Sequence, residues 1–281
     1  MEITMRREEM RENNGAKKIT KVVGVSAIAM MLTMTTMMGA LPQKAYAAPS
    51  QQVQMIELAS TTKYQVVTAS HYEHKDGTME ASIQTPKVKG ITKAIQKFNQ
   101  QMANYTKKLE KQYKADVKKA KEQLGGTENG HESITTTFSI TCNNDRYLSI
   151  QILTTEAMGS TSTTSKAFTL DKKTGKMMAL KDFFQSRADY QSVISKEVIA
   201  KMEQTMKKDS SHVYYVKGSN IEDVTYFNKI AKNQNFYINK NGKLTIVFDE
   251  GDVAPQYMGI CKFVIEKQAM KDILKTNIAL Q

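Results

Sequence analysis

The stretch that decides the fold is residues 235–259, NFYINKNGKLTIVFDEGDVAPQYMG. Two strand-like runs, 235–238 and 243–248, flank the tetrapeptide NKNG at 239–242. Asn-Gly tolerates the positive φ that a tight hairpin turn requires. A third strand-like run follows at 260–265. The stretch therefore predicts three consecutive antiparallel strands near the C-terminus.

The loop between the second and third of these runs combines acidic side chains with a tyrosine that follows a proline. Asp249, Glu250 and Asp252 lie at the end of the second run. Pro255 comes next, and because proline has a fixed φ, it presents Tyr257 from a stiff support. This loop is the first candidate for a functional surface.

Upstream, residues 89–124 carry the clearest periodicity of the chain. Apolar residues recur there every three or four positions, which predicts one face of a long amphipathic helix that ends at Gly125. The expected apolar stripe is Ile91, Ile95, Phe98, Met102, Tyr105, Leu109, Tyr113, Val117, Ala120 and Leu124.

The remaining segments alternate between strand-like and helix-like patterns. Strands are predicted at 63–71, 78–87 (ended by Pro86), 131–142, 146–155 and 163–170, with a short helical turn at 181–184 and helices at 187–208, 221–230 and 267–278. Hairpins interrupted by helices predict an α+β fold, with an antiparallel sheet packed against one long and several shorter helices.

The N-terminus has the features of an export segment. Six basic residues precede a mostly apolar stretch at 22–41, which is near the length that spans a bilayer. Small residues at Ala45 and Ala47 fit signal-peptidase cleavage after Ala47. Two alternatives stay open, a cleaved signal peptide and a retained single-span anchor. Both place the protein outside the cell or at the cell envelope.

These features divide the chain into four parts. Residues 1–47 are the signal peptide or anchor, and 48–62 are a linker. The N-terminal part of the folded module is expected at 63–158 and its C-terminal part at 159–281.

The formal net charge of the chain is +12. Residues 1–47 hold seven Lys or Arg and four Glu, so the remainder carries 33 basic and 24 acidic residues, or +9. This balance favours anionic partners such as wall polymers, and export excludes nucleic acid. A solvated surface is the plainer interpretation, since many lysines share the long helix: Lys107, Lys108, Lys111, Lys114, Lys118, Lys119 and Lys121.

Two further sets of residues have candidate chemistry. Cys142 and Cys261 make an even count, which in an exported chain permits a disulfide, with two buried thiols as the alternative. His71 and His74 invite a metal interpretation, but in a strand positions i and i+3 face opposite sides. No metal and no cofactor is therefore expected.

Taken together, the 235–259 block and two upstream motifs resemble the extracellular lysozyme-binding module of anti-sigma-V factors, which is also attached to some cell-wall polysaccharide deacetylases. The upstream motifs are FTLD at 168–171 with TGK at 174–176, and LKDFF at 180–184. The resemblance covers roughly 63–274. It implies a non-enzymatic module that recognises an extracellular protein such as lysozyme.

In that family a loop around an Ala-Pro pair and a neighbouring loop enter the lysozyme cleft. The matching positions here are Pro255, Gln256 and Tyr257, with Met158, Gly159, Ser160 and Thr161 as the neighbouring loop. Only 21 residues precede the apolar stretch, which is about six helical turns. Members of that family bind a sigma factor through a cytoplasmic segment. Such binding is not expected of this chain, because its N-terminal segment is short.

Two other functions stay open. The lysine face, 107–121, could bind an anionic wall polymer. A wall hydrolase could use Asp249, Glu250 and Asp252 as its acids. No Gly-x-Ser-x-Gly elbow, P-loop or HExxH motif occurs in the sequence.

Overall fold

The computed structural model describes residues 64–281 apart from residues 129 and 159. The expected export segment and linker lie outside these residues. The described elements, in chain order, are β1 (Val66–Asp76), β2 (Met79–Val88), α2 (Lys93–Leu124), β3 (Glu132–Asn143), β4 (Tyr147–Met158), β5 (Ser160–Asp171), β6 (Lys176–Met177), the 3-10 helix η1 (Leu180–Phe183), α3 (Tyr190–Lys208), β7 (Phe236–Ile238), β8 (Leu244–Phe248), the 3-10 helix η2 (Gln256–Met258), β9 (Cys261–Ile265) and α4 (Lys267–Met270).

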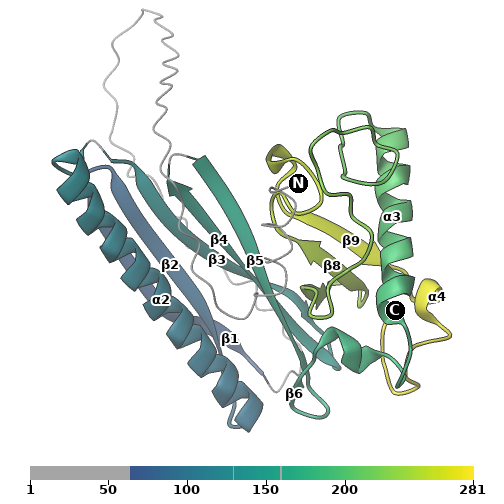
Figure 1. Ribbon diagram of the computed structural model, residues 1–281. Coiled ribbons are helices and arrows are strands. Elements are labelled where there is room, and N and C mark those ends of the chain that lie inside the picture. The colour runs from purple at the N-terminus through teal and green to yellow at the C-terminus, as the bar shows by residue number, and fades with distance from the viewer. Residues whose placement is uncertain (1–63, 129, 159) are drawn as a thin grey trace, which may run out of the picture. The chain divides into compact units, whose positions relative to one another are not determined.

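The strands form two sheets (Figure 1). Six strands pair in the order β1-β2-β3-β4-β5-β6, and three pair in the order β7-β8-β9. The expected α+β class is confirmed, but the purely antiparallel sheet is wrong, because β2 and β3 are parallel. Helix α2 connects these two strands. It carries the chain back to the end of the sheet at which β2 began, so β3 runs in the same direction as β2.

Helix α2 begins at a polar cap and ends at a glycine. The Thr92 hydroxyl accepts a hydrogen bond from the Ile95 N–H at 3.3 Å, and Gly125 follows the last turn with φ of 73°. The expected stripe is buried between Ile95 and Val117, where it packs on the six-stranded sheet. It is wrong at both ends, since Ile91 precedes the helix and is 91% exposed, and Leu124 is 45% exposed.

Strand β4 lies between two layers, because successive side chains of a strand point to opposite faces. Leu148, Ile150 and Ile152 belong to the apolar cluster that α2 covers. On the other face, the Ser149 hydroxyl accepts a hydrogen bond from the Ile238 N–H of β7 at 3.1 Å. The three-stranded sheet is thus held against the six-stranded sheet by polar contacts.

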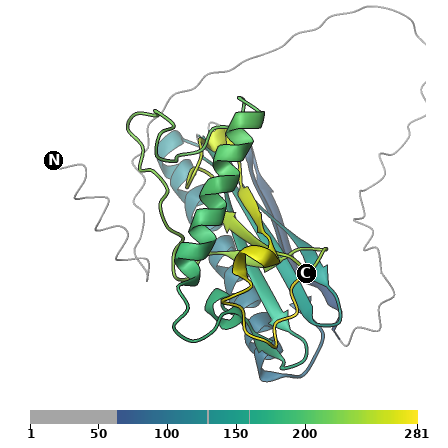
Figure 2. The same ribbon diagram turned by 90° about the vertical axis from the view of Figure 1, so that its right-hand side faces the viewer.

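The three-stranded sheet shares its core with α3, which crosses in front of it in Figure 2. Two expected helices are wrong here. Residues 221–230 form a loop, in which the Phe227 N–H bonds to the Tyr215 carbonyl at 2.6 Å and Asp223 has φ of 58°. The helix expected at 267–278 stops at Met270, because the Lys275 N–H bonds instead to the Phe183 carbonyl at 3.0 Å.

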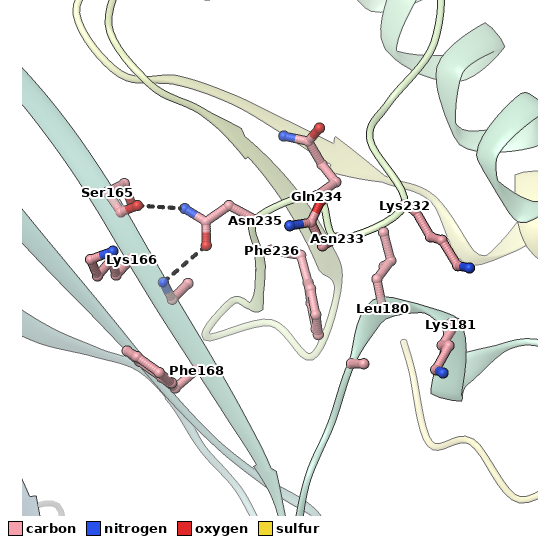
Figure 3. A pocket seen from close by; sticks show the side chains of 12 residues that line it. Ser165, Lys166, Phe168, Leu180, Lys181, Lys232, Asn233, Gln234, Asn235 and Phe236 are labelled. Carbon is pink, nitrogen blue, oxygen red and sulfur yellow. Dashed lines mark hydrogen bonds between the residues drawn. The ribbon is translucent and has the colours of Figure 1, made fainter. Parts of the chain in front are cut away.

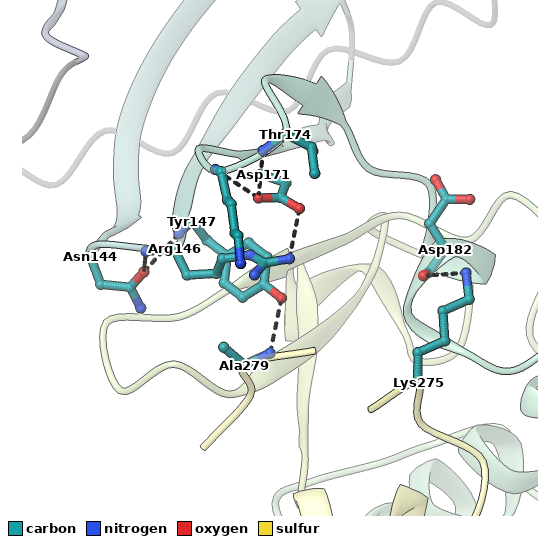
Figure 4. Close-up of polar contacts among 9 residues, drawn as sticks. Asn144, Arg146, Tyr147, Asp171, Thr174, Asp182, Lys275 and Ala279 are labelled. Carbon is teal, nitrogen blue, oxygen red and sulfur yellow. Dashed lines mark hydrogen bonds and ion pairs between the residues drawn. The ribbon is translucent and has the colours of Figure 1, made fainter. Parts of the chain in front are cut away.

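Polar contacts fix the C-terminal tail to the start of β4, and the β3–β4 turn to the end of β5 (Figure 4). The Tyr147 hydroxyl accepts a hydrogen bond from the Ala279 N–H at 3.3 Å. Beside it, Arg146 pairs with the buried Asp171 carboxylate at 2.9 Å. The same carboxylate accepts the Lys173 N–H at 2.9 Å, which shapes the turn into β6.

Two smaller expectations also differ. Pro86 lies inside β2, opposite Thr68, and does not end the strand. The missing N–H of proline is tolerated there because β2 pairs with β3 only as far as Ile83. Within the described residues, no helix is both long and apolar enough to cross a membrane.

The α2 packing yields a stability prediction. Leu109 is 3% exposed, so Leu109→Asp should destabilise the fold by about 3 kcal/mol or more, since it buries an unpaired carboxylate. Lys111→Asp, two residues along on the exposed side, should change stability by about 0.5 kcal/mol or less. Chemical unfolding of both variants checks this, and equal small shifts would mean that the stripe is not core.

Candidate recognition surface

The β8–β9 loop presents Tyr257 to solvent. Pro255 precedes η2 with φ of −55°, and the Tyr257 side chain on η2 is 71% exposed. Val253 and Ala254, just before the proline, are buried in the core of the three-stranded sheet. An anchored base and a short 3-10 turn therefore hold a large exposed aromatic ring in one place.

The neighbouring loop expected at 158–161 is the tip of the β4–β5 hairpin. Met158 pairs with Ser160, and Ala157 pairs with Thr161, so the two strands continue almost to the turn. Gly159 lies outside the described residues. Met158 is 42% exposed, and Ser160 and Thr161 are also exposed.

The acidic residues of the β8–β9 loop bind the edge of β5, three to five residues beyond the hairpin tip. The Glu250 carboxylate accepts a hydrogen bond from the Thr163 N–H, and the Glu250 N–H donates to the Thr163 carbonyl at 3.4 Å. The Asp249 carboxylate accepts the Ser165 N–H at 2.7 Å. These contacts bring the two loops that the sequence singled out to the same edge of the sheet.

Asn235 extends this contact along the strand, as Figure 3 shows. Its side chain accepts a hydrogen bond from the Ala167 N–H at 2.9 Å and donates to the Ser165 carbonyl at 3.0 Å. A groove of about 570 Å³ opens beside it, with Lys166, Lys181 and Lys232 among its lining residues. Side chains therefore hydrogen-bond the backbone N–H and C=O groups at the β5 edge, where another strand could otherwise pair.

The same contacts show how the three candidate catalytic acids are used. Asp249 and Glu250 accept backbone N–H groups of β5, and the Asp252 carboxylate accepts the Asp249 N–H at 3.0 Å. Burial raises the pKa of Asp249, which the Ser165 N–H partly offsets. Asp249 and Glu250 thus join the sheets and Asp252 shapes the loop, which gives the hydrolase interpretation no support.

The lysine face of α2 is partly neutralised. Three of its seven lysines pair with carboxylates: Lys114 with Glu110 at 2.5 Å, Lys118 with Glu122 at 3.7 Å, and Lys121 with Asp76 at 2.5 Å. Exposed pairs of this kind contribute little to stability. They do reduce the net positive charge that this face offers to a polyanion.

The cysteines and histidines have local roles. Cys142 and Cys261 are buried free thiols, and burial raises the pKa of Cys261 to about 11, so it is protonated at neutral pH. On β1, His71 lies 2.7 Å from Glu73, while His74 contacts the Tyr113 hydroxyl at 3.2 Å. In the part of the chain that the structure describes, no three His, Cys, Asp or Glu side chains are placed to hold a metal ion.

A buried carboxyl lies on β3 beside the tip of the β4–β5 hairpin. Glu132 is 3% exposed and pairs across the sheet with Met158. Burial, followed by the charge of Asp116 on α2 and a hydrogen bond with it, raises the pKa of Glu132 to about 8. The Glu156 carboxylate contributes to the same rise, while Lys119 opposes it. Glu132 is therefore mostly protonated at neutral pH.

The structure thus brings the two candidate loops to one edge, and it adds functional residues that sequence reasoning missed. Asn235, Asp249 and Glu250 accept hydrogen bonds from the β5 backbone. The sequence marked Asn235 only as a strand start, and the two acids as an acidic patch or as candidate catalytic acids. The only sign of this role in the sequence is that these polar residues stand directly before β7 and directly after β8. Their position did not show that the strand they bond, β5, lies about 70 to 90 residues upstream.

Comparison with known proteins finds one family model and solved structures that resemble this chain. A family described as a protein of unknown function, DUF3298, matches residues 181–268. A solved DUF3298 family protein from Pseudomonas aeruginosa PAO1 has a TM-score of 0.53 at 11% identity, over 79% of this chain and 98% of that one. A solved member from Bacteroides fragilis NCTC 9343 has a TM-score of 0.49 at 15% identity, over 77% of this chain and 96% of that one.

A curated relative is more specific. The anti-sigma-V factor RsiV of Bacillus subtilis (strain 168) is 32% identical over 209 residues, which are 72% of this chain and 67% of RsiV. The chain therefore belongs to the family of the anti-sigma-V factor RsiV. The resemblance carried by residues 168–184 and 235–259 is confirmed.

The β5 edge yields a second prediction. Asn235→Ala removes the partners of the Ala167 N–H and the Ser165 carbonyl, and it should destabilise the fold by about 2 kcal/mol. Asn233→Ala, at an exposed position in the same segment, is the matched control and should cost about 0.5 kcal/mol or less. Urea unfolding measures both, and equal values would show that the side-chain bonds to β5 contribute nothing.

Glu132 yields a third prediction, on pH. Its pKa is raised on folding from 4.5 to about 8, so the folded state holds the proton more tightly than the unfolded state. Its contribution favours folding at low pH and is lost as pH rises from about 5 to 8. Melting temperature should therefore fall more steeply over this range in the wild type than in Glu132→Gln. Glu128→Gln, at an exposed position, should behave as wild type; parallel curves for all three would contradict the assignment.

Proposed function

We propose that this protein is an exported or membrane-anchored sensing module without catalytic activity, which binds an extracellular protein of the lysozyme type. Membership of the RsiV family supports a sensing role, since that relative is an anti-sigma factor and not an enzyme. The hydrogen bonding of the acidic residues is consistent with this, because backbone groups occupy the carboxylates that a hydrolase would need.

The exposure of Tyr257 is the observation that carries the proposal. A tyrosine that is 71% exposed on a short, anchored turn offers a large contact area at a low cost in conformational entropy. At this exposure the Tyr257 ring contributes little to the core. Its position after Pro255 matches the loop that the family inserts into the lysozyme cleft.

The second part of the proposed surface is the hairpin tip with Met158, Gly159, Ser160 and Thr161. Met158 adds an exposed apolar side chain, and Gln256 lies beside Tyr257 on η2. Because Glu250 bonds to Thr163, movement of one loop relative to the other is restricted. Such preorganisation favours binding, since little ordering is left to occur in the complex.

Charge affects the rate of such an encounter. The chain downstream of residue 47 carries +9, which would slow the approach of a basic partner. Asp252 is exposed on the same loop as Tyr257 and offsets this locally. Binding of a basic partner should therefore depend on the loop more than on the net charge.

An anionic wall polymer on the lysine face of α2 is the second candidate. The exposed lysines that are not paired in the described structure, such as Lys107, Lys108 and Lys111, favour it. Retention on wall material that falls steeply with salt, and falls again when these lysines are replaced by Gln, would support this function in place of protein binding.

The fourth prediction tests the aromatic anchor. Tyr257→Ala should weaken lysozyme binding by about 2 kcal/mol, or roughly thirtyfold in Kd. Met158→Ala and Pro255→Ala should weaken it less, through lost contact area and lost loop rigidity respectively. Calorimetric titration of lysozyme with each variant measures the affinities, and an active-site inhibitor of lysozyme should compete.

Ile140→Ala is the control for this experiment. Ile140 is also exposed, at 42%, but it lies on β3 away from the hairpin tip. Its removal should leave lysozyme binding unchanged. Absence of heat with the wild type, or equal affinities for wild type and Tyr257→Ala, would overturn the proposed function.

A further inference from the structure

One exposed apolar side chain has no part in either candidate surface. Ile91 is 91% exposed, on the short link between β2 and α2. Single exposed apolar residues are common on proteins. What distinguishes Ile91 is that two neighbouring segments carry exposed lysines and contain no acidic residue over a long stretch of sequence.

Lysines surround Ile91 from two segments of the chain. Lys87, Lys89 and Lys93 flank it in sequence and are exposed, and residues 81–109 contain no Asp or Glu. The β5–β6 turn adds Lys173 and Lys176, also exposed. Residues 172–181 contain no acidic residue either.

These two segments are in contact. The Gly175 Cα faces the Thr92 side chain, so closely that an added Cβ would lie 3.6 Å from the Thr92 methyl carbon. Figures 1 and 2 both show the start of α2 and the β5–β6 turn at the same end of the domain. We call this surface the basic pole: Lys87, Lys89, Ile91, Lys93, Lys173 and Lys176.

The chain enters the described domain at the basic pole. The Tyr64 ring packs against Gly90, where an added Cβ would lie 3.1 Å from a ring carbon. The Gln65 carbonyl accepts the Lys89 N–H at 2.7 Å. Residues 42–63 are the 22 residues between the predicted apolar stretch and this point, and they can span at most about 75 Å. An uncleaved N-terminal segment would therefore tether the pole to the membrane at no more than this distance.

We infer that the basic pole docks on an anionic lipid surface, with Ile91 entering the head-group region and the surrounding lysines contacting acidic lipid head groups. Clusters of lysine near a membrane attachment point are attracted by anionic lipid, and an exposed apolar side chain among them adds a contribution from burial. This interaction lies outside the proposed function, because Tyr257 and the hairpin tip have no part in it.

Ile91 favours lipid over a soluble polyanion as the partner. A wall polymer in water would contact the lysines but would offer no apolar phase for an aliphatic side chain. Docking through the basic pole would also orient the domain so that the proposed protein-binding surface faces away from the lipid. The basic pole lies at the end of β5 and the hairpin tip at its start, so docking would hold the recognition surface about 40 Å from the lipid.

The fifth prediction tests the environment of residue 91. The full chain with Ile91→Cys is labelled with a polarity-sensitive fluorophore and reconstituted into vesicles. Cys142 and Cys261 are buried, so labelling is directed to the new thiol. Emission should shift to shorter wavelength in phosphatidylglycerol-containing vesicles compared with pure phosphatidylcholine, and the shift should be lost in 1 M salt. The same label at Ile140→Cys should not respond to lipid.

Matched charge variants complete the test. Replacement of Lys87, Lys89 and Lys93 by Gln should abolish the shift at residue 91. Replacement of Lys107, Lys108 and Lys111 by Gln removes the same amount of charge from α2, away from the basic pole, and should leave the shift intact. Equal melting temperatures exclude misfolding as the cause. Identical emission in both lipids, equal effects of both triple variants, or a shift caused by teichoic acid without anionic lipid would overturn the inference.

Discussion

The bonding of the β5 edge by side chains is the interaction on which the rest of the structure depends. An exposed strand edge leaves N–H and C=O groups that must find partners. Here Asn235, Asp249 and Glu250 supply these partners from the start of β7 and the end of β8. The exchange is reciprocal, because the backbone of Ile238 on β7 bonds to the hydroxyls of Thr141 and Ser149 in the larger sheet. Two sheets that do not share a strand are thereby joined.

This join also explains why the proposed recognition surface has two parts. The Tyr257 loop begins at the acids that bond to β5. The hairpin tip lies three residues before Thr163, the first β5 residue that they bond. Their relative position comes largely from hydrogen bonds between the acidic side chains and the β5 backbone, which have a preferred length and direction.

Local patterns were sufficient to predict most elements. The stripe from Ile95 to Val117 predicted α2, and Asn-Gly at 241–242 predicted the β7–β8 hairpin. Long-range pairing was not predictable in the same way. The parallel register of β2 and β3 depends on where α2 returns the chain, and the helix expected at 267–278 lost its backbone partners to η1. For the candidate surface, the sequence identified the loops, while the acceptor roles of Asn235, Asp249 and Glu250 required the coordinates.

The bonding of β5 by Asp249 and Glu250 has a consequence for which sequence changes this fold can tolerate. Asp249 and Glu250 bond to N–H groups, which every residue except proline provides, and not to the side chains of the Ser/Thr run at 160–165. Most replacements in that run would therefore leave the joint between the sheets intact. The hairpin tip is free to diversify in chemistry while its position is retained, as in an antibody loop on a constant framework. A scaffold of this kind can acquire a new ligand by changes at its tip alone.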